Sequence, residues 1–259
     1  MNKEQLIAII NDTIDKCYFQ YSWMIAKSEN YYYPEGYFID RKLIKKFTKA
    51  NIKLVQKTTV EAIIENKDKV YAVLNFASAK RPGGGVLNGA VAQEEALARA
   101  SSLLPVIEFC REFYSGPPSS PYYSDRIIYS TPIYVFKDDN GVDIEPIKCD
   151  VITCAAPNYS FDKIDIEEHR EVMRKRFVKV LKSAIDNGQK NLILGAWGCG
   201  VFKNPPSINA QVFREVLDAF STYFDEIIFA IPDNTNYQIF KYNLFDLPDD
   251  EKSMMKFNI

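Results

Sequence analysis

The stretch YAVLNFASAKRPGGGVLNGAVAQEE occupies residues 71–95. Its first seven residues form a continuous apolar run, which is typical of a buried strand. Three glycines follow at 83–85, where the backbone can take positive φ and a ligand can approach without interference from a Cβ. Gln-Glu-Glu at 93–95 then opens an alanine-rich segment, residues 92–104, that predicts a helix. Two adjacent carboxylates beside a bare loop indicate a site for a polyhydroxylated ligand that carries phosphate.

Strand-like apolar segments alternate with amphipathic segments along the rest of the chain. Besides 71–77, strands are predicted near residue 51, on both sides of Pro132 within 126–139, and at 149–157, 191–197 and 225–233. Helices are predicted within residues 1–25, after the strand near 51, over 167–187, and from Ser207 as an N-cap. This alternation predicts an α/β protein with helices on both faces of its sheet.

Three loops follow predicted strands, at 78–85, 195–202 and 232–236. Ligands of such sheets bind at the carboxyl ends of the strands. If the strands before the first two loops lie near each other, both glycine loops are expected to face one crevice. The second loop, GAWGCGVF, has three glycines, and its successive backbone N–H groups can form a concave anion site. It lacks the Gly-Lys-Ser/Thr ending of a Walker loop.

Composition excludes several other classes of protein. Apolar residues make up 47% and charged residues 25% of the 259 residues, and the net charge is −2, so neither a general nucleic-acid binder nor a membrane protein is expected. The five cysteines contain no C-x-x-C pair, and the opening residues lack the pattern of a secretory signal. Free thiols and a cytoplasmic location are therefore expected.

His169 is the only histidine, and it stands in a strongly charged helical segment that predicts a solvated surface position. A Ser-His-Asp triad or a histidine-rich metal site would have to use it, so both kinds of site are disfavoured. The chemistry is expected to come from carboxylates, backbone amides and a few hydroxyls.

The two glycine loops together resemble the macro-domain poly(ADP-ribose) glycohydrolases of the microbial type. That family is marked by Gly-Gly-Gly, six to eight residues, and Gln-Glu-Glu, and the spacing here is seven residues. The lead-in NFASAKRP at 75–82 and the loop at 195–202 also resemble the family. The resemblance extends over residues 50–245. It implies a macro-domain-like mixed sheet at 51–259 and a helical N-terminal extension at 1–50 that packs on this body.

The resemblance also implies a role for each site residue. Glu95 matches the catalytic acid, and Glu94 matches the residue that holds a ribose hydroxyl beside the scissile bond. Residues 83–85 match the loop around the diphosphate and distal ribose, and 198–201 match the other wall of the phosphate site. The implied substrate-binding residues are Ser78, Gly83, Gly84, Gly85, Gln93, Gly198, Cys199, Gly200, Val201 and Phe202.

The implied activity is hydrolysis of the ribose–ribose bonds of poly(ADP-ribose) on modified proteins, without metal or cofactor. A carboxylic acid must protonate the leaving oxygen of such a bond, and a neighbouring carboxylate would raise the pKa of that acid. Alternatives are a mono-ADP-ribosyl hydrolase and a reader of ADP-ribose, although a reader needs no acid at this position. Adenine contacts are expected from a loop with Asn234, Asn236 and Tyr237, or these residues lie on the surface. Nothing in the sequence indicates an oligomeric state.

Overall fold

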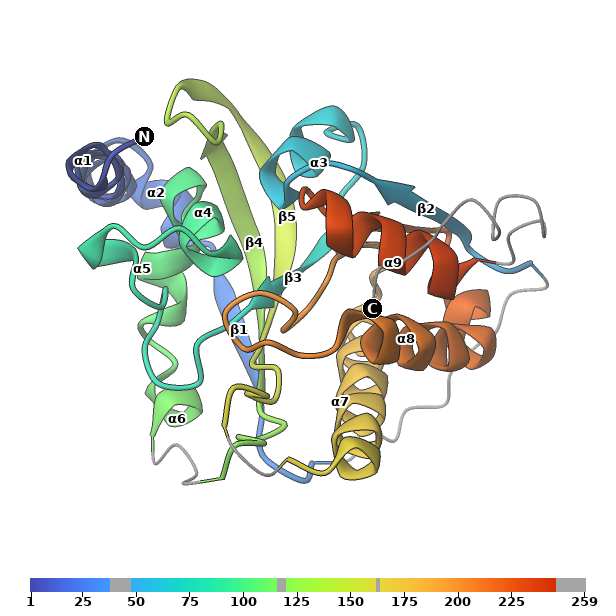
Figure 1. Cartoon of the computed structure of the whole chain (residues 1–259). Coiled ribbons are helices and arrows are strands. Elements are labelled where there is room, and N and C mark those ends of the chain that lie inside the picture. Colours follow the sequence, from blue (N-terminus) through green and yellow to red (C-terminus); the bar gives the residue numbers. More distant parts are fainter. Residues whose placement is uncertain (38–47, 116–119, 162–163, 246–259) are drawn as a thin grey trace.

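The computed structural model describes residues 1–37, 48–115, 120–161 and 164–245. Within these ranges the chain forms a mixed seven-stranded sheet with helices on both sides (Figure 1). In their order across the sheet the strands are β1 (Glu29–Tyr33), β4 (Ile127–Lys137), β5 (Asp143–Cys154), β3 (Ala72–Phe76), β6 (Asn191–Leu194), β7 (Glu226–Ala230) and β2 (Asn51–Val55). β4 is antiparallel to both β1 and β5, and all other neighbours are parallel. The predicted α/β class with a mixed sheet is confirmed.

The helices divide between the two faces of this sheet (Figure 1). One face is covered by α7 (Ile166–Asp186), α8 (Pro206–Phe220) and α9 (Asn234–Leu244). The other is covered by α3 (Thr59–Glu65), α4 (Gln93–Ala100), α5 (Leu103–Ile107) and α6 (Arg111–Tyr114). The remaining elements are α1 (Lys3–Asp15), the π-helical turn η1 (Lys16–Gln20), α2 (Ser22–Ile25) and the 3-10 turns η2 (Val86–Asn88) and η3 (Ser221–Tyr223). No helix in the described ranges has both the length and the apolar character needed to cross a membrane.

The central strands are buried on both faces, which explains their continuous apolar sequences. Along β3, Leu74 belongs to the core under α7 and α8, whereas its neighbour Val73 belongs to the core under α3 and α4. This alternation is the period of two that a strand imposes on its side chains. Phe213 of α8 anchors the first core, with its ring centroid 4.2 Å from that of Phe177.

The parallel order β3–β6–β7 brings three carboxyl ends to the same edge of the sheet. Ala72 pairs with Leu192, and Leu192 pairs with Ile227, so the three strands are in direct succession. The loops that follow them therefore start side by side, as the sequence predicts.

The described part of the first 50 residues packs against the rest of the chain through β1 and α1. β1 extends the sheet beside β4, and Ile10 of α1 packs with Val86, Ala98 and Leu104. The proposed division at residue 50 stays a prediction, and its parts at 38–47 and 246–259 lie outside the described residues.

Several predicted boundaries differ from the structure. The helix predicted over 92–104 is divided into α4 and α5, because Ser101 is extended and forms a β-bridge with Val135. β4 continues through Pro132 as one strand, because a register shift between Ser130 and Ile133 absorbs the residue that cannot donate to the ladder. α8 begins at Pro206 with Pro205 as its N-cap, so Ser207 is not the cap. A proline fits the first helical turn, where its missing N–H would have no partner within the helix.

The prediction that His169 is a solvated surface residue is wrong. Its side chain is fully buried between α7 and α8, where Nε2 lies 3.3 Å from Oδ1 of Asn209 and the ring meets the ring of Tyr159 edge-on. His169 is one turn before Met173, which is also fully buried, so it lies on the apolar face of a helix whose neighbouring residues are charged. Burial lowers the pKa of His169 below its ordinary value of 6.5.

This burial predicts a pH-dependent contribution of His169 to stability. Because its pKa is lower in the folded protein, the neutral ring stabilises the fold above about pH 6.5, and this stabilisation is lost as the pH falls. We expect His169→Ala to lower the free energy of unfolding by about 2 kcal/mol near pH 7.5 and by less near pH 5. Urea unfolding of both proteins at the two pH values measures this, and an equal loss at both would contradict it.

Candidate active site

Glu94 and Glu95 lie side by side in the first turn of α4, where the N–H groups and the positive end of the helix dipole favour negative charge. Both side chains are buried, with exposed fractions of 2% and 8%. Two buried carboxylates are costly unless hydrogen-bond donors surround them. The start of α4 must therefore be held accurately against its neighbours.

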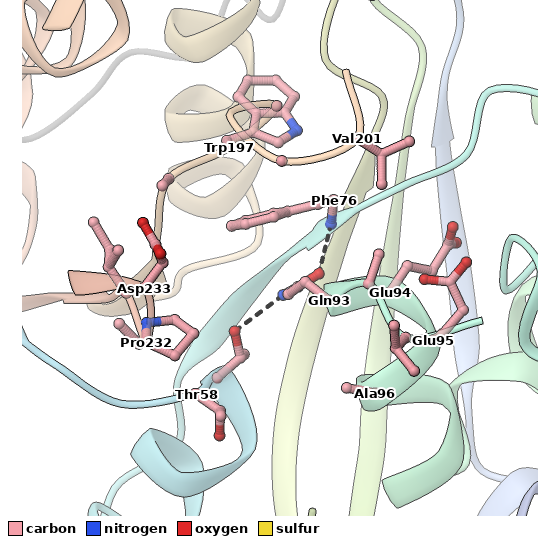
Figure 2. A pocket seen from close by; sticks show the side chains of 18 of the residues that line it. Thr58, Phe76, Gln93, Glu94, Glu95, Ala96, Trp197, Val201, Pro232 and Asp233 are labelled. Carbon is pink, nitrogen blue, oxygen red and sulfur yellow. Dashed lines mark hydrogen bonds between the residues drawn. The ribbon is translucent and has the colours of Figure 1, made fainter. Parts of the chain in front are cut away.

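The side-chain amide of Gln93 fixes the start of α4 by hydrogen bonds. Its Oε1 accepts a hydrogen bond from the backbone N of Phe76 at 2.9 Å (Figure 2). Its Nε2 donates to Oγ1 of Thr59 at 3.1 Å and to the carbonyl of Leu74 at 3.0 Å. The amide thus joins α4 to the end of β3 and to α3. A contact between Gln93 and substrate stays a prediction, whereas its positioning of the two glutamates follows directly from these bonds.

Glu94 accepts hydrogen bonds on both of its oxygens. The backbone N of Ser78 donates to Oε2 at 2.7 Å, and Nδ2 of the fully buried Asn75 donates to Oε1 at 3.2 Å. Burial raises the pKa of Glu94 to about 8, the two hydrogen bonds oppose this change, and the charge of Glu95 adds to it. The glutamate pair therefore keeps a proton near neutral pH.

Glu95 is less fully engaged. The backbone N of Gly85 donates to Oε1 at 2.9 Å, and among the described residues this is the only donor to the carboxylate. Gly84 lies directly against both glutamates: a Cβ on it would be 2.5 Å from Oε1 of Glu95 and 3.1 Å from Oε2 of Glu94. Its φ of +60° is also one that favours glycine.

Two amides of the triple glycine donate within the protein. The backbone N–H of Gly84 donates to the carbonyl of Arg81 at 3.1 Å, and that of Gly85 donates to Oε1 of Glu95 at 2.9 Å. The amide of Gly83 lowers the pKa of Glu94. In this geometry the loop encloses the carboxylates. Its contact with a diphosphate or a distal ribose stays a prediction.

A cavity of about 490 Å³ opens beside the two glutamates at the carboxyl ends of β3, β6 and β7. The loops after these strands contribute Ser78, Phe202 and Pro232 among others, so residues from all three loops meet at one cavity. The predicted site residues that line it are Glu94, Glu95, Ser78, Gln93, Gly198, Gly200, Val201 and Phe202. Gly83, Gly84, Gly85 and Cys199 are outside this lining.

The second glycine loop offers unengaged backbone donors to the cavity. Among the described residues no protein acceptor receives the N–H groups of Gly198, Gly200, Val201 or Phe202. Nδ2 of the buried Asn204 holds the loop in place by donating to the carbonyls of Gly198 at 3.0 Å and Pro157 at 2.7 Å. Successive free amides of this kind favour an anion.

The thiol of Cys199 points back into the protein, where Nδ2 of Asn209 lies 3.6 Å from its sulfur. Burial raises the pKa of this thiol to about 12, so it is protonated and unsuited to nucleophilic attack. If Cys199 contacts a ligand, the contact must be made by its backbone.

Several residues of the site escape the sequence analysis. The ring of Phe76 lies across the cavity in Figure 2, and Asp139 reaches the lining from the turn between β4 and β5. Asn75 has a signal in the sequence, because it is an amide within an apolar strand. Asn234, Asn236 and Tyr237 lie in α9 rather than in a loop, because Asp233 caps that helix, and of the three only Asn236 lines the cavity.

The comparisons with known proteins agree with this geometry. Residues 11–138 match the family model described as microbial-type PARG, catalytic domain, where PARG is poly(ADP-ribose) glycohydrolase. The crystal structure of poly(ADP-ribose) glycohydrolase from Thermomonospora curvata is 30% identical over 93% of this chain and 99% of its own, with a TM-score of 0.85. The chain belongs to the microbial-type poly(ADP-ribose) glycohydrolase family. The predicted family, its macro-domain-like fold and its enzyme class are thereby confirmed.

Two further glycohydrolase structures carry ligands. The Thermomonospora curvata enzyme bound to the inhibitor ADP-HPD is 30% identical over 92% of this chain and 99% of its own, with a TM-score of 0.81. The Deinococcus radiodurans enzyme in complex with ADP-ribose is 33% identical over 77% of this chain and 86% of its own, with a TM-score of 0.72. A search of curated proteins gave no match.

The contact between Gly84 and the glutamates predicts a strong effect of one methyl group. We expect Gly84→Ala to lower turnover by about 10²-fold or more, because the new Cβ displaces the carboxylates. Gly188→Ala is a matched control, since Gly188 also has a left-handed φ, +74°, but nothing within 4 Å of its Cβ position. It should cost about 1 kcal/mol of stability and leave turnover unchanged. Equal turnover in the two variants would contradict this.

The raised pKa of Glu94 predicts how stability depends on pH. Its ordinary pKa is 4.5, so the folded protein binds an extra proton between that value and about pH 8 and loses stability as the pH rises through this window. In the wild type we expect the free energy of unfolding to fall by on the order of 3 kcal/mol between about pH 5 and pH 8.5 because of Glu94. In Glu94→Gln this decrease should be absent. Urea unfolding at both pH values measures it, and parallel losses in wild type and variant would disprove it.

Proposed function

We propose that the glutamate pair cleaves the ribose–ribose bonds of poly(ADP-ribose) with Glu95 as the general acid and Glu94 as the residue that holds a ribose hydroxyl. One observation carries this assignment. Both oxygens of Glu94 accept hydrogen bonds from the protein, whereas Oε2 of Glu95 has no donor among the described residues and its side chain lines the cavity. Glu95 is therefore the carboxyl that can reach a leaving oxygen.

The chemistry follows from these positions. Protonated Glu95 donates its proton to the bridging oxygen, and the bond from that oxygen to the anomeric carbon breaks with its electron pair going to the oxygen. Water adds to the oxocarbenium-like sugar and loses a proton, which returns Glu95 to its acid form. The products are ADP-ribose with a free anomeric hydroxyl and a shortened polymer. Proton transfer of this kind typically contributes about 10²–10⁴-fold to the rate.

The second glycine loop would supply much of the binding. We place the diphosphate of the substrate on the free amides of Gly198, Gly200 and Val201, where the geometry favours an anion. Phe202 at the end of this loop lines the cavity and would pack on the nucleotide. The remaining rate enhancement would come from orientation of the bond against Glu95.

The expected setting of the enzyme also remains a proposal. All five cysteines are free, which supports a cytoplasmic location, and proteins that carry poly(ADP-ribose) are the proposed partners.

Glu95→Gln tests the catalytic assignment. This variant removes the proton donor but keeps an oxygen for the Gly85 amide, so we expect ADP-ribose affinity within about 3-fold of wild type and turnover reduced by about 10²–10⁴-fold. Calorimetry and release of ADP-ribose from auto-modified poly(ADP-ribose) polymerase measure the two quantities. Turnover equal to wild type would exclude Glu95 as the acid.

A parallel sample of mono-ADP-ribosylated protein distinguishes the two hydrolase activities. We expect release from the polymer and none from the mono-modified protein. Release from the mono-modified protein alone would instead establish a mono-ADP-ribosyl hydrolase.

A further inference from the structure

Arg99 is a buried cation one helical turn after Glu95 on α4. Its side chain has an exposed fraction of 8%, and its Nη1 donates to the carbonyl of Ala90 at 2.6 Å. A buried guanidinium is costly, as the lowered pKa of Arg99 reflects, so its position calls for a compensating interaction. The acceptor, Ala90, lies in the segment that connects the triple glycine to α4.

The bond to Ala90 closes a circuit that ends at Glu95. The backbone N of Ala90 donates to the carbonyl of Gly85 at 3.2 Å, and the backbone N of Gly85 donates to Oε1 of Glu95 at 2.9 Å. Both ends of the circuit are side chains of the same helix, four residues apart. The guanidinium therefore fixes the loop that delivers the only described donor to Glu95.

Charge reinforces this arrangement. Glu95 and Asp139 are the carboxylates whose charges act on Arg99, and both line the cavity. The cation lies behind Glu95 in the helix and outside the cavity lining. It can therefore act on the reaction through Glu95 without touching substrate.

We infer that Arg99 is a positioning residue for glycosidic cleavage, which holds the Gly85 amide on Glu95 by anchoring the carbonyl of Ala90. This inference rests on the proposed role of Glu95. It assigns Arg99 an effect on kcat rather than on ADP-ribose affinity, because the free amides of the second glycine loop lie elsewhere in the cavity.

Thr13 offers a matched control. Its Oγ1 donates to the backbone carbonyl of Arg99 at 2.6 Å, so Thr13→Val removes a buried hydrogen bond at the same residue without changing the guanidinium. If Arg99 had only a structural role, a substitution of Arg99 and Thr13→Val would affect kcat to the same extent. A positioning role separates them, because Thr13 has no part in the circuit through Ala90 and Gly85.

The test compares Arg99→Gln, Arg99→Lys and Thr13→Val by kcat and KM on poly(ADP-ribose), ADP-ribose affinity by calorimetry, and thermal unfolding. We expect Arg99→Gln to lower kcat about 10–100-fold with affinity within about 3-fold of wild type. The decrease in kcat should be smaller for Arg99→Lys, because lysine keeps the positive charge and a donor although it lacks the planar guanidinium. Thr13→Val should unfold at a lower temperature with unchanged kcat.

Specific results would overturn the inference. Wild-type kcat in a folded Arg99→Gln protein would do so, as would equal losses of kcat in Arg99→Gln and Thr13→Val. If Arg99→Gln does not fold, wild-type kcat in Arg99→Lys overturns it. Glu95→Gln separates this inference from the proposed function. If Glu95→Gln keeps wild-type turnover, Glu95 is not the acid. If Glu95→Gln is inactive and Arg99→Gln has wild-type kcat, only the role of Arg99 is refuted.

Discussion

Burial of two neighbouring carboxylates is the constraint on which the site depends. Charged groups leave water only where donors replace it, and here the donors come from Asn75 of β3, from the backbone of Ser78 just after it, and from Gly85 of the triple glycine. The same burial lets the pair keep a proton near neutral pH, which is what an acid catalyst requires. The absence of a side chain at Gly84 leaves room for both carboxylates in this space. The burial that provides this proton also lowers the stability of the fold as the pH rises through the window between pH 4.5 and about pH 8.

The two glycine loops have different tasks, although both look alike as sequences. The first loop donates one amide, that of Gly85, to a carboxylate, whereas four amides of the second loop, which lines the cavity, have no acceptor among the described residues. Asn204 and Asn209 hold the second loop from the protein side through its carbonyls and its cysteine, so its N–H groups remain available. A glycine-rich sequence indicates that the backbone lies close to another group. Whether that group is a side chain of the protein or a ligand depends on which amides already have an acceptor.

Much of the fold could be predicted, because buried parallel strands leave continuous apolar runs and helices leave a period of 3.6. The site could be located because its residues cluster at strand ends, and the resemblance supplied their roles. His169 was misjudged because its sequence neighbours are charged, whereas burial depends on the helix face shared with Met173. Asp139 was missed because the long β4–β5 hairpin carries it to the cavity from far along the chain. Local sequence says little about such distant contacts, nor did it show that the amide of Gln93 is used within the protein.

The packing of α1 affects how the protein folds during translation. Its apolar residue Ile10 finds its partners Val86, Ala98 and Leu104 only after these have been synthesised, and Lys16 pairs with Asp143 across 127 positions. The apolar side of α1 therefore stays uncovered until residue 104 has been translated, and its ion pair can form only after residue 143. Contacts that span so much sequence slow folding and prolong exposure to aggregation. α1, which packs against Val86 just after the triple glycine, is thus translated before its partners and docks late.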